Sequence, residues 1–282
     1  MAYSLSPLRY PGGKSVLTPF LRSVLETNGM HGGTYAEPFC GGAGIGLGLL
    51  LNGIVHNIIL NDVDPSIYAF WWALLNKSES FIHCIEQIPI NTDEWQRQKG
   101  IFFDPSAELF DRGFATFFLN RCNHSGILSA NPIGGIRQNG KWKIDARFNK
   151  KSLISRIENI IKYRDKIIIN NLDVFDFIKN IQHQDKNIFI YFDPPYLQGG
   201  PTLYLNSFTE KTHLDLASSL RGLSHKWIMT YDDARLLHKA YEYCRIMKFE
   251  LSYSVHKKRK GIELLIIPEQ TILPDSSKLK CV

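Results

Sequence analysis

Short apolar runs alternate with longer amphipathic stretches along most of this chain, and that alternation constrains its fold most strongly. Strands covered on both faces read as short, continuous apolar runs, whereas the helices that cover them are amphipathic. The pattern therefore predicts an α/β fold with a mainly parallel sheet. The predicted strands are Thr34–Glu37, Asn57–Asn61, Lys166–Asn170, Ile188–Phe192 and Trp227–Thr230, with a closing hairpin near Arg245–Tyr253 and Glu263–Ile267, and predicted helices include Ile45–Asn52 and Pro65–Asn76.

The middle of the chain does not continue this alternation. From Ser80 to about Arg156 the pattern is mostly helical, as in Phe110–Arg121, and it then becomes irregular and glycine-rich at Asn131–Gly135. The Asn-Gly turn signal within Gln138–Lys141 predicts a β-hairpin. We therefore expect an inserted second domain at 80–156, within a discontinuous main domain formed by 1–79 and 157–282.

Composition excludes several classes of protein. The chain is 44% hydrophobic and 21% charged, which is ordinary for a soluble globular protein. No apolar run approaches the roughly 18–20 residues that span a bilayer, and the first ten residues lack the apolar stretch of a signal peptide. We expect a cytoplasmic protein without a membrane partner. The cysteines form no CxxC pair, so neither a metal site nor a disulfide framework is predicted; they are Cys40, Cys84, Cys122, Cys244 and Cys281.

Basic residues are concentrated in two places. The net charge is +6 with a pI near 9.0, which permits a polyanionic partner without establishing one. The stretch from Arg137 to Lys151 contains six cations against the single acid Asp145, and a second run is His256–Lys260. For each run taken alone, a solvated surface is an equally good interpretation.

The strongest chemical signal is Asp193-Pro194-Pro195-Tyr196, which directly follows the apolar run Ile188–Phe192. Open α/β sheets bind ligands at the carboxyl ends of their strands. The two prolines fix the turn and remove two backbone donors, so their carbonyls are available as acceptors. A carboxylate, a rigid carbonyl and an aromatic face suit a flat ring that bears an exocyclic amine. The alternative is a proline-rich turn that merely ends a core strand.

A glycine-rich turn, Glu37–Gly44, follows the first predicted strand and opens a helix. It does not match the dinucleotide fingerprint GxGxxG. However, Asp62 lies 21 residues beyond Gly41, at the end of the next apolar run. A carboxylate at that position can bind the ribose hydroxyls of a nucleoside cofactor. The alternative is that Asp62 caps the helix that begins at Pro65.

A third motif, Arg9–Ser15, contains Gly-Lys-Ser but is not a phosphate-binding P-loop. Such a loop needs glycine five residues before Gly13, and that position is Leu8; no apolar strand precedes it either. A nucleoside triphosphatase is therefore disfavoured, and we expect Lys14 to meet a carboxylate on a ligand.

Together these stretches resemble the Dam-type (D12 class, α group) family of N6-adenine DNA methyltransferases over nearly the whole chain. Ala43 replaces the last glycine of the family's FxGxG motif, although Gly42 and Gly44 flank it. The recognition region, Asn123–Phe148, does not resemble the version that reads GATC. The matching segments are Leu8–Lys14, Phe39–Ala43, Asp62, Phe117–Arg121 with Ser125-Gly126, Asp193–Tyr196, Ser207-Phe208 and Trp227–Tyr231.

The resemblance implies a Rossmann-like S-adenosylmethionine-dependent methyltransferase sheet of seven strands, mostly parallel with one antiparallel strand. The inserted helical and β-hairpin domain would recognise DNA. Tyr10 and Lys14 would contact S-adenosylmethionine, Phe39 and Gly41 would lie beside its methionine moiety, and Asp62 would bind its ribose. Asp173 lies where family members often contact the cofactor adenine, but a helix-capping role explains it nearly as well.

The expected activity is that of a site-specific, adenine-specific DNA methyltransferase. Asp193 and the Pro194 carbonyl would accept the adenine N6–H groups, and Tyr196 would stack on a base flipped out of the duplex. Trp142 and Phe148 would either pack the hairpin, which we favour, or touch bases. The residues expected to contact DNA are Arg121, Asn123, Arg137, Lys141, Lys143, Arg147, Lys257, Lys258 and Arg259.

Two alternatives keep the fold and change the function. The first is an S-adenosylmethionine-dependent methyltransferase that acts on RNA or on a protein amide, although such enzymes carry asparagine where this chain has Asp193. The second is a DNA-binding relative that has lost catalysis.

The sequence gives neither the target motif nor the biological role, whether restriction–modification, defence or an enzyme without a partner endonuclease. We expect a monomer.

Overall fold

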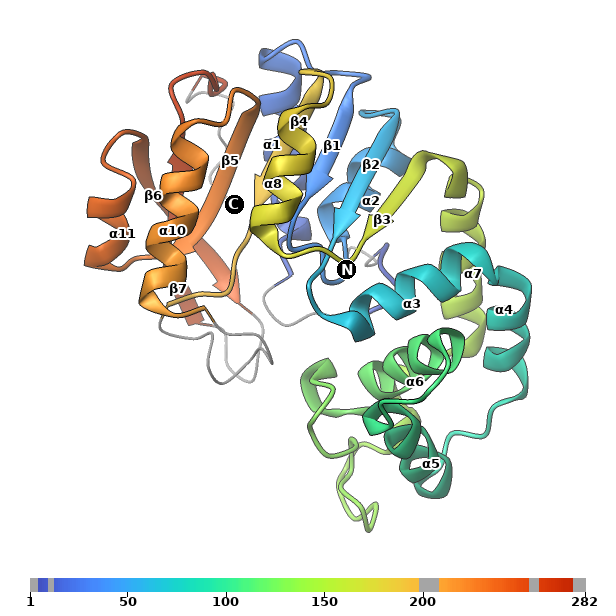
Figure 1. Cartoon of the computed structure of the whole chain (residues 1–282). Helices are drawn as coiled ribbons and strands as arrows, with labels where there is room; N and C mark the ends of the chain where they lie inside the picture. The colour runs from blue at the N-terminus through green and yellow to red at the C-terminus, as the bar shows by residue number, and fades with distance from the viewer. Residues whose placement is uncertain (1–4, 10–12, 198–207, 254–258, 276–282) are drawn as a thin grey trace. The chain divides into compact units, whose positions relative to one another are not determined.

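A computed structural model describes residues 5–9, 13–197, 208–253 and 259–275, with side chains omitted for residues 250–261 (Figure 1). The chain forms two compact units. The helical unit consists of Met1–Gly13 and Asp64–Asp165, and the sheet unit of Lys14–Val63 and Lys166–Val282. The segment predicted as an inserted domain, 80–156, falls within the helical unit.

The sheet unit is built on a seven-stranded sheet with the order β3-β2-β1-β4-β5-β7-β6. Strands β1 to β5 are parallel, and β7 runs antiparallel to both of its neighbours, β5 and β6. This confirms the predicted mixed sheet with one antiparallel strand. The strands are β1 (Thr34–Glu37), β2 (Asn57–Asn61), β3 (Ile167–Asn170), β4 (Ile188–Phe192), β5 (Lys226–Asp232), β6 (Arg245–Tyr253) and β7 (Arg259–Ile267).

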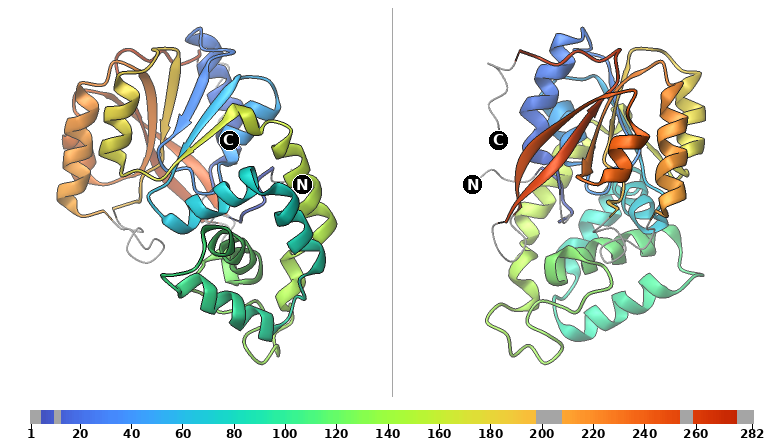
Figure 2. Two further views of the ribbon diagram at one scale, coloured as in Figure 1. Left: turned by 45° about the vertical axis from the view of Figure 1, so that its right-hand side comes forward. Right: turned by 90° about the vertical axis from the view of Figure 1, so that its left-hand side faces the viewer.

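Helices cover both faces of this sheet (Figure 2). Helices α1 (Thr18–Thr27) and α2 (Gly44–Leu51) lie on one face, and α8 (Val174–Gln182), α10 (Glu210–Arg221) and α11 (Arg235–Ala240) lie on the other. The second face buries a continuous core that includes Phe177, Leu216 and Trp227. Strand β4 is therefore apolar and buried throughout, because helices exclude water from both of its faces.

The order of the strands locates the ligand edge. The chain leaves β1 toward β2 and β3 and then returns to place β4 on the other side of β1. The loops that follow β1 and β4 therefore run in opposite directions from the sheet. In open α/β sheets, ligands bind at the carboxyl ends of the two strands between which the strand order reverses. The loop after β1 carries the glycine-rich turn, and the loop after β4 carries Asp193.

The helical unit packs around aromatic side chains. Phe117 stacks on Phe70 with ring centroids 6.1 Å apart and meets Phe148 edge-on at 5.5 Å. Helices α3 and α6 approach closely at Gly113, where an added Cβ would lie 2.3 Å from the Ala69 carbonyl oxygen. The helices are α3 (Pro65–Asn76), α4 (Ser78–Gln87), α5 (Thr92–Phe103), α6 (Leu109–Cys122) and α7 (Lys150–Ile161).

The hairpin expected around Gln138–Lys141 does not form. Gly134, Gly135 and Gln138 all have positive φ, which bends the chain into consecutive turns. The Gln138 side chain fixes them, because its Nε2 donates to the Ile133 and Gly135 carbonyls while its Oε1 accepts from the Ile144 amide. We call residues 134–143 the basic loop. Side-chain hydrogen bonds to the backbone replaced the strand ladder that the Asn-Gly signal had indicated.

Within the described part of the chain, no helix is long and apolar enough to cross a membrane.

Candidate active site

The Asp193 carboxylate stands at the end of β4, and its described contacts all go to one oxygen. Oδ1 accepts a hydrogen bond from Thr230 Oγ1 at 3.0 Å and from the Tyr196 hydroxyl at 3.4 Å, and it lies 3.3 Å from Lys14 Nζ. The Tyr191 hydroxyl lies 2.6 Å from Thr230 Oγ1. Because Thr230 donates to Asp193, Tyr191 is the donor to Thr230. Among the described residues, Oδ2 receives no such contact, and the side chain is 24% exposed.

Lys14 connects Asp193 to a second carboxylate. Its ammonium lies 3.5 Å from Glu263 Oε1 and 4.8 Å from the centroid of the Tyr196 ring. Both Lys14 and Glu263 are buried. Sequence reasoning expected Lys14 to meet a carboxylate on a ligand; in the structure it meets two carboxylates of the protein. We call Lys14, Asp193, Tyr196 and Glu263 the carboxylate cluster.

The turn after β4 is held from β5. Asp232 Oδ1 accepts a hydrogen bond from the Leu197 amide at 3.0 Å. Pro194 is buried, and Pro195 and Tyr196 are partly buried. Burial raises the pKa of the Tyr196 hydroxyl, and the neighbouring Asp193 raises it further. Tyr196 is therefore neutral and can donate a hydrogen bond near neutral pH.

The glycine-rich turn after β1 is bonded to the end of β2. Asp62 Oδ2 accepts the Gly41 amide at 2.9 Å, and Asn61 Nδ2 donates to the Pro38 carbonyl at 2.9 Å. Ala43, which replaces the family's glycine, has φ 48° and ψ 37°. This left-handed conformation costs an L-residue roughly 1–2 kcal/mol. The turn therefore keeps the backbone path of a glycine despite the substitution.

Glu37 is a second buried acid at this edge, at the end of β1. Its Oε1 accepts the Gly46 amide at 2.8 Å, which ties β1 to the first turn of α2. Burial raises the pKa of Glu37 to about 8, against the opposing effect of that hydrogen bond. Glu37 is therefore a structural acid that remains largely protonated at neutral pH.

Two further predicted cofactor residues, Phe39 and Asp173, lie on the sheet unit. Phe39 is partly buried and meets Phe208 edge-on, with ring centroids 5.8 Å apart. Asp173 is exposed and caps α8 by accepting the Phe175 amide at 2.8 Å. The capping role, which was the alternative for Asp173, is thus present in the structure. Tyr10 lies outside the described residues.

The predicted DNA-binding residues separate into two groups. Arg137, Lys141, Lys143 and Arg147 are exposed, in or just after the basic loop. Trp142 beside them is 67% exposed, so it does not pack a hairpin core, whereas Phe148 is buried. Lys257 and Lys258 lie outside the described residues, as does the Arg259 side chain.

Arg121 and Asn123 belong to the second group, because both are buried and bonded inside the helical unit. Arg121 donates to the Arg147 carbonyl, and burial lowers the pKa of its guanidinium to about 9. Asn123 accepts the Trp95 indole N–H at 2.7 Å and donates to the carbonyls of Ile127 and Leu128. Both side chains are turned away from solvent, and their polar groups bind partners inside the helical unit.

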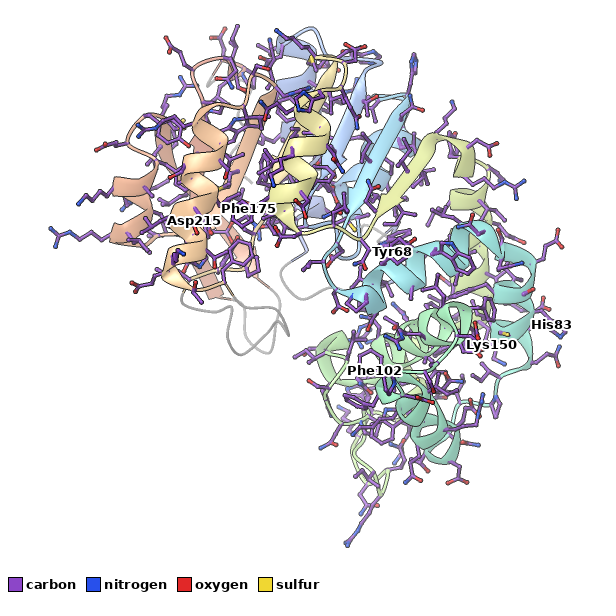
Figure 3. The ribbon with its side chains drawn as sticks, in the orientation of Figure 1. Tyr68, His83, Phe102, Lys150, Phe175 and Asp215 are labelled. Carbon is purple, nitrogen blue, oxygen red and sulfur yellow. The ribbon has the colours of Figure 1, made fainter. Side chains whose placement is uncertain are left out.

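Lys150 likewise has an internal role. Its ammonium donates to the Glu86 and Ile88 carbonyls at 2.7 Å each, which fastens α7 to the end of α4 (Figure 3). The basic stretch from Arg137 to Lys151 is thus not a uniformly free charged surface.

Sequence reasoning missed Thr230, Asp232 and Glu263 as members of the site. Thr230 and Glu263 are lone polar residues within apolar runs, and both are almost completely buried. A buried polar side chain must be bonded or paired to avoid a large desolvation cost. Such an interruption of an apolar strand is the signal that could have revealed them.

A mixed sheet with a glycine-rich turn after β1, an acid after β2 and Asp-Pro-Pro-Tyr after β4 defines a Rossmann-like methyltransferase. The chain belongs to the D12 class N6 adenine-specific DNA methyltransferase family, whose model matches residues 10–255. It is thus a member of an adenine-specific DNA methyltransferase family.

Three relatives resemble it at low identity. The type II methyltransferase M.MjaIII of Methanocaldococcus jannaschii is 24% identical over 74% of this chain and 73% of its own. M.CviBI, a type II methyltransferase of Paramecium bursaria Chlorella virus NC1A, is 24% identical over 82% and 86%. The DNA adenine methylase of Haemophilus influenzae is 25% identical over 67% and 63%.

Proposed function

We propose that this protein transfers a methyl group from S-adenosylmethionine to N6 of an adenine within a specific DNA sequence. The asymmetry of the Asp193 carboxylate carries the proposal. Thr230, Tyr196 and Lys14 all contact Oδ1 and so fix the orientation of the carboxylate. Oδ2 is the oxygen that faces a substrate, and it suits an N–H donor such as adenine N6.

The residues present fit the proposed cofactor. A nucleoside with a charged amino-acid tail needs a carboxylate for its hydroxyls, an apolar contact and a backbone that it can approach closely. Asp62, Phe39 and the turn at Gly41 supply these three features at neighbouring strand ends. Asp62 would hold the ribose, and Phe39 and Gly41 would lie against the methionine moiety. The bound cofactor supplies an activated methyl group on a sulfonium.

Adenine N6 needs activation because its lone pair is delocalised into the ring. When Asp193 Oδ2 accepts one N6–H and the Pro194 carbonyl accepts the other, the lone pair localises and turns toward the methyl donor. The S–methyl bond of the donor would break as the N–C bond forms, and the donor would leave as a neutral thioether. Positive charge develops on N6 meanwhile, and Asp193 would receive the proton that N6 releases. Solvent then takes that proton from the partly exposed carboxylate.

The adenine must leave the duplex to reach this carboxylate. Bases that undergo chemistry are extruded from the stack into a pocket, where aromatic side chains replace the lost stacking. Tyr196 follows Asp193 by three residues, and its hydroxyl donates to Asp193 Oδ1. The same residue thus orients the carboxylate and presents an aromatic ring for a flipped base.

The exposed cations of the basic loop and Arg147 form the proposed DNA-binding surface. Each phosphate contact contributes a slope of about −0.9 to the logarithm of affinity against the logarithm of salt concentration. Replacing Lys141 and Arg147 together with alanine should make this slope less steep by about 2. The measurement is fluorescence anisotropy of a labelled duplex over a salt series.

A matched control removes the same charge elsewhere on the helical unit. Lys77 and Lys162 are exposed cations outside the basic loop. Their double alanine variant should keep the wild-type slope. Equal slopes for all three proteins would contradict the assignment of the basic loop to DNA.

The direct test of the proposed function is methyl transfer from radiolabelled S-adenosylmethionine to unmethylated genomic DNA, followed by mapping at base resolution. N6-methyladenine confined to one short motif is the expected result, and it would also identify the sequence at which a partner endonuclease should be blocked. Transfer to RNA or protein instead of DNA would refute the proposed substrate. Failure to bind the cofactor would favour a catalytically inactive DNA-binding relative.

A further inference from the structure

Glu263 is an acid in an otherwise apolar strand. The run Ile262–Ile267 contains only this charged residue, and its relative exposure is 2%. The reversed direction of β7 explains its position. Glu263 pairs in register with Asp232, the last residue of β5, so the antiparallel strand brings its early residues to the carboxyl edge of the parallel strands.

Burying a carboxylate is costly unless a partner compensates it. Neither oxygen of Glu263 accepts a hydrogen bond of normal geometry from the described residues. Its ion-pair partner is Lys14, whose Nζ lies 3.5 Å from Oε1. Lys14 also lies 3.3 Å from Asp193 Oδ1. Two carboxylates therefore share one buried ammonium.

We propose that Glu263 is a positioning residue that acts through Lys14 and sets the charge of the carboxylate cluster during methyl transfer. This inference rests on the proposed function. With Glu263 ionised, the cluster carries two negative charges and one positive charge, a net charge of −1. With Glu263 protonated, the net charge of the cluster is zero, and Asp193 is its one remaining carboxylate charge.

The net charge matters because positive charge moves onto N6 as the methyl group is transferred. In the ground state the positive charge is on the methyl donor, farther from the cluster, and in the transition state it is partly on N6. A cluster of charge −1 therefore stabilises the transition state more than the ground state, which speeds the reaction. Ionised Glu263 also draws the Lys14 ammonium away from Asp193, which strengthens Asp193 as an acceptor of N6–H. Protonation of Glu263 removes both effects.

The burial of Glu263 makes this change accessible near neutral pH. Burial raises the pKa of Glu263 to about 7, while Lys14 lowers it and the Asp193 charge raises it. The hydroxyls of Tyr196 and of Tyr191 on β4 also interact with Glu263. The residues in register with Glu263 are Asp232 on β5 and the apolar Phe249 on β6. Lys14 is thus the cation that this group meets among the described side chains.

The test is the single-turnover rate of methyl transfer as a function of pH, measured with saturating cofactor and a methyl-accepting duplex. The wild-type rate should rise about tenfold through an inflection near pH 7. Glu263→Gln should abolish the inflection and hold the rate near the acid plateau, because the amide is neutral at every pH. Binding of S-adenosylmethionine by this variant should stay within about twofold of wild type.

Glu37→Gln is the matched control. Glu37 is also a buried acid whose pKa is raised to about 8, mainly by burial and also by the charge of Asp193. Its hydrogen-bond partners, however, are the Gly46 amide and Tyr35, neither of which belongs to the cluster. This variant should keep the inflection near pH 7. An inflection that persists in Glu263→Gln, or that disappears in Glu37→Gln, would overturn the role assigned to Glu263.

A second measurement covers the case in which Glu263→Gln does not fold. In the Glu37→Gln background, infrared difference spectroscopy should show one protonated buried carboxyl disappearing between about pH 6 and pH 8. Absence of that band would refute the inference. Failure of the proposed function is distinct, since wild-type protein would then transfer no methyl group to DNA at any pH.

Discussion

Replacing Asp193 with asparagine is expected to lower the rate of methyl transfer by at least about 1,000-fold while the protein still folds and binds S-adenosylmethionine. Asparagine keeps the shape of the side chain, but it can place an N–H donor where N6–H must be accepted, and it carries no charge to stabilise the positive charge on N6. The measurement is single-turnover transfer, with cofactor affinity from calorimetry.

Asp233→Asn provides the control for this result. Asp233 lies just beyond β5. It forms an ion pair with Lys248 at 2.6 Å and a hydrogen bond with His238 Nε2 at 2.8 Å, and neither residue is a described contact of Asp193. Its variant should retain transfer within about threefold of wild type. Near-normal transfer by Asp193→Asn would refute the proposed mechanism, because that mechanism needs the Asp193 carboxylate as the acceptor of N6–H.

Replacing Lys14 with methionine is expected to destabilise the protein by about 3 kcal/mol at pH 8, because it leaves the buried Glu263 and the partly exposed Asp193 without their shared cation. The loss should be smaller at about pH 6. Without the ammonium, the folded-state pKa of Glu263 rises further above its unfolded value. Between the unfolded-state and folded-state pKa values of Glu263, the folded protein binds more protons than the unfolded protein. The free energy of unfolding therefore falls as the pH rises through this interval, which is wider in the variant. Urea denaturation at the two pH values measures this.

The double variant Lys14→Met with Glu263→Gln isolates the cause. Removing the second carboxylate should restore a large part of the stability lost at pH 8 and flatten its dependence on pH. If the double variant is as unstable as Lys14→Met alone, then lost packing of the lysine stem, rather than unbalanced charge, explains the effect.

The sequence predicted most of the sheet because its signals are local. The bounds of β1, β2, β4, β6 and α3 were predicted without error. Strands β2 and β4 are built on short apolar runs, and apolar and polar residues alternate along most of β6. The Pro at the start of α3 marks a helix N-terminus. Three other strands were predicted less accurately, because charged residues lie at or beside their ends: β3 begins at Ile167 and not Lys166, β5 covers Lys226–Asp232 and not Trp227–Thr230, and β7 begins at Arg259 and not Glu263.

The parts that escaped prediction depend on contacts between distant residues. Nothing near Lys14 in the sequence shows that β7 will bring Glu263 within 3.5 Å of it. Likewise, the charge of Arg121 suggested DNA, whereas the fold uses its guanidinium to bind the carbonyl of Arg147, 26 residues away. Charge and residue type limit what a side chain can do, and the tertiary structure decides which of those roles it takes.

Every described side chain that contacts Asp193 comes from the sheet unit, whereas the basic loop belongs to the helical unit inserted between its two segments. Under the proposed function, selection for a new target sequence would act on one set of residues while selection for methyl transfer preserves another. Changes within 64–165 would then alter the sequence specificity and leave the chemistry unchanged.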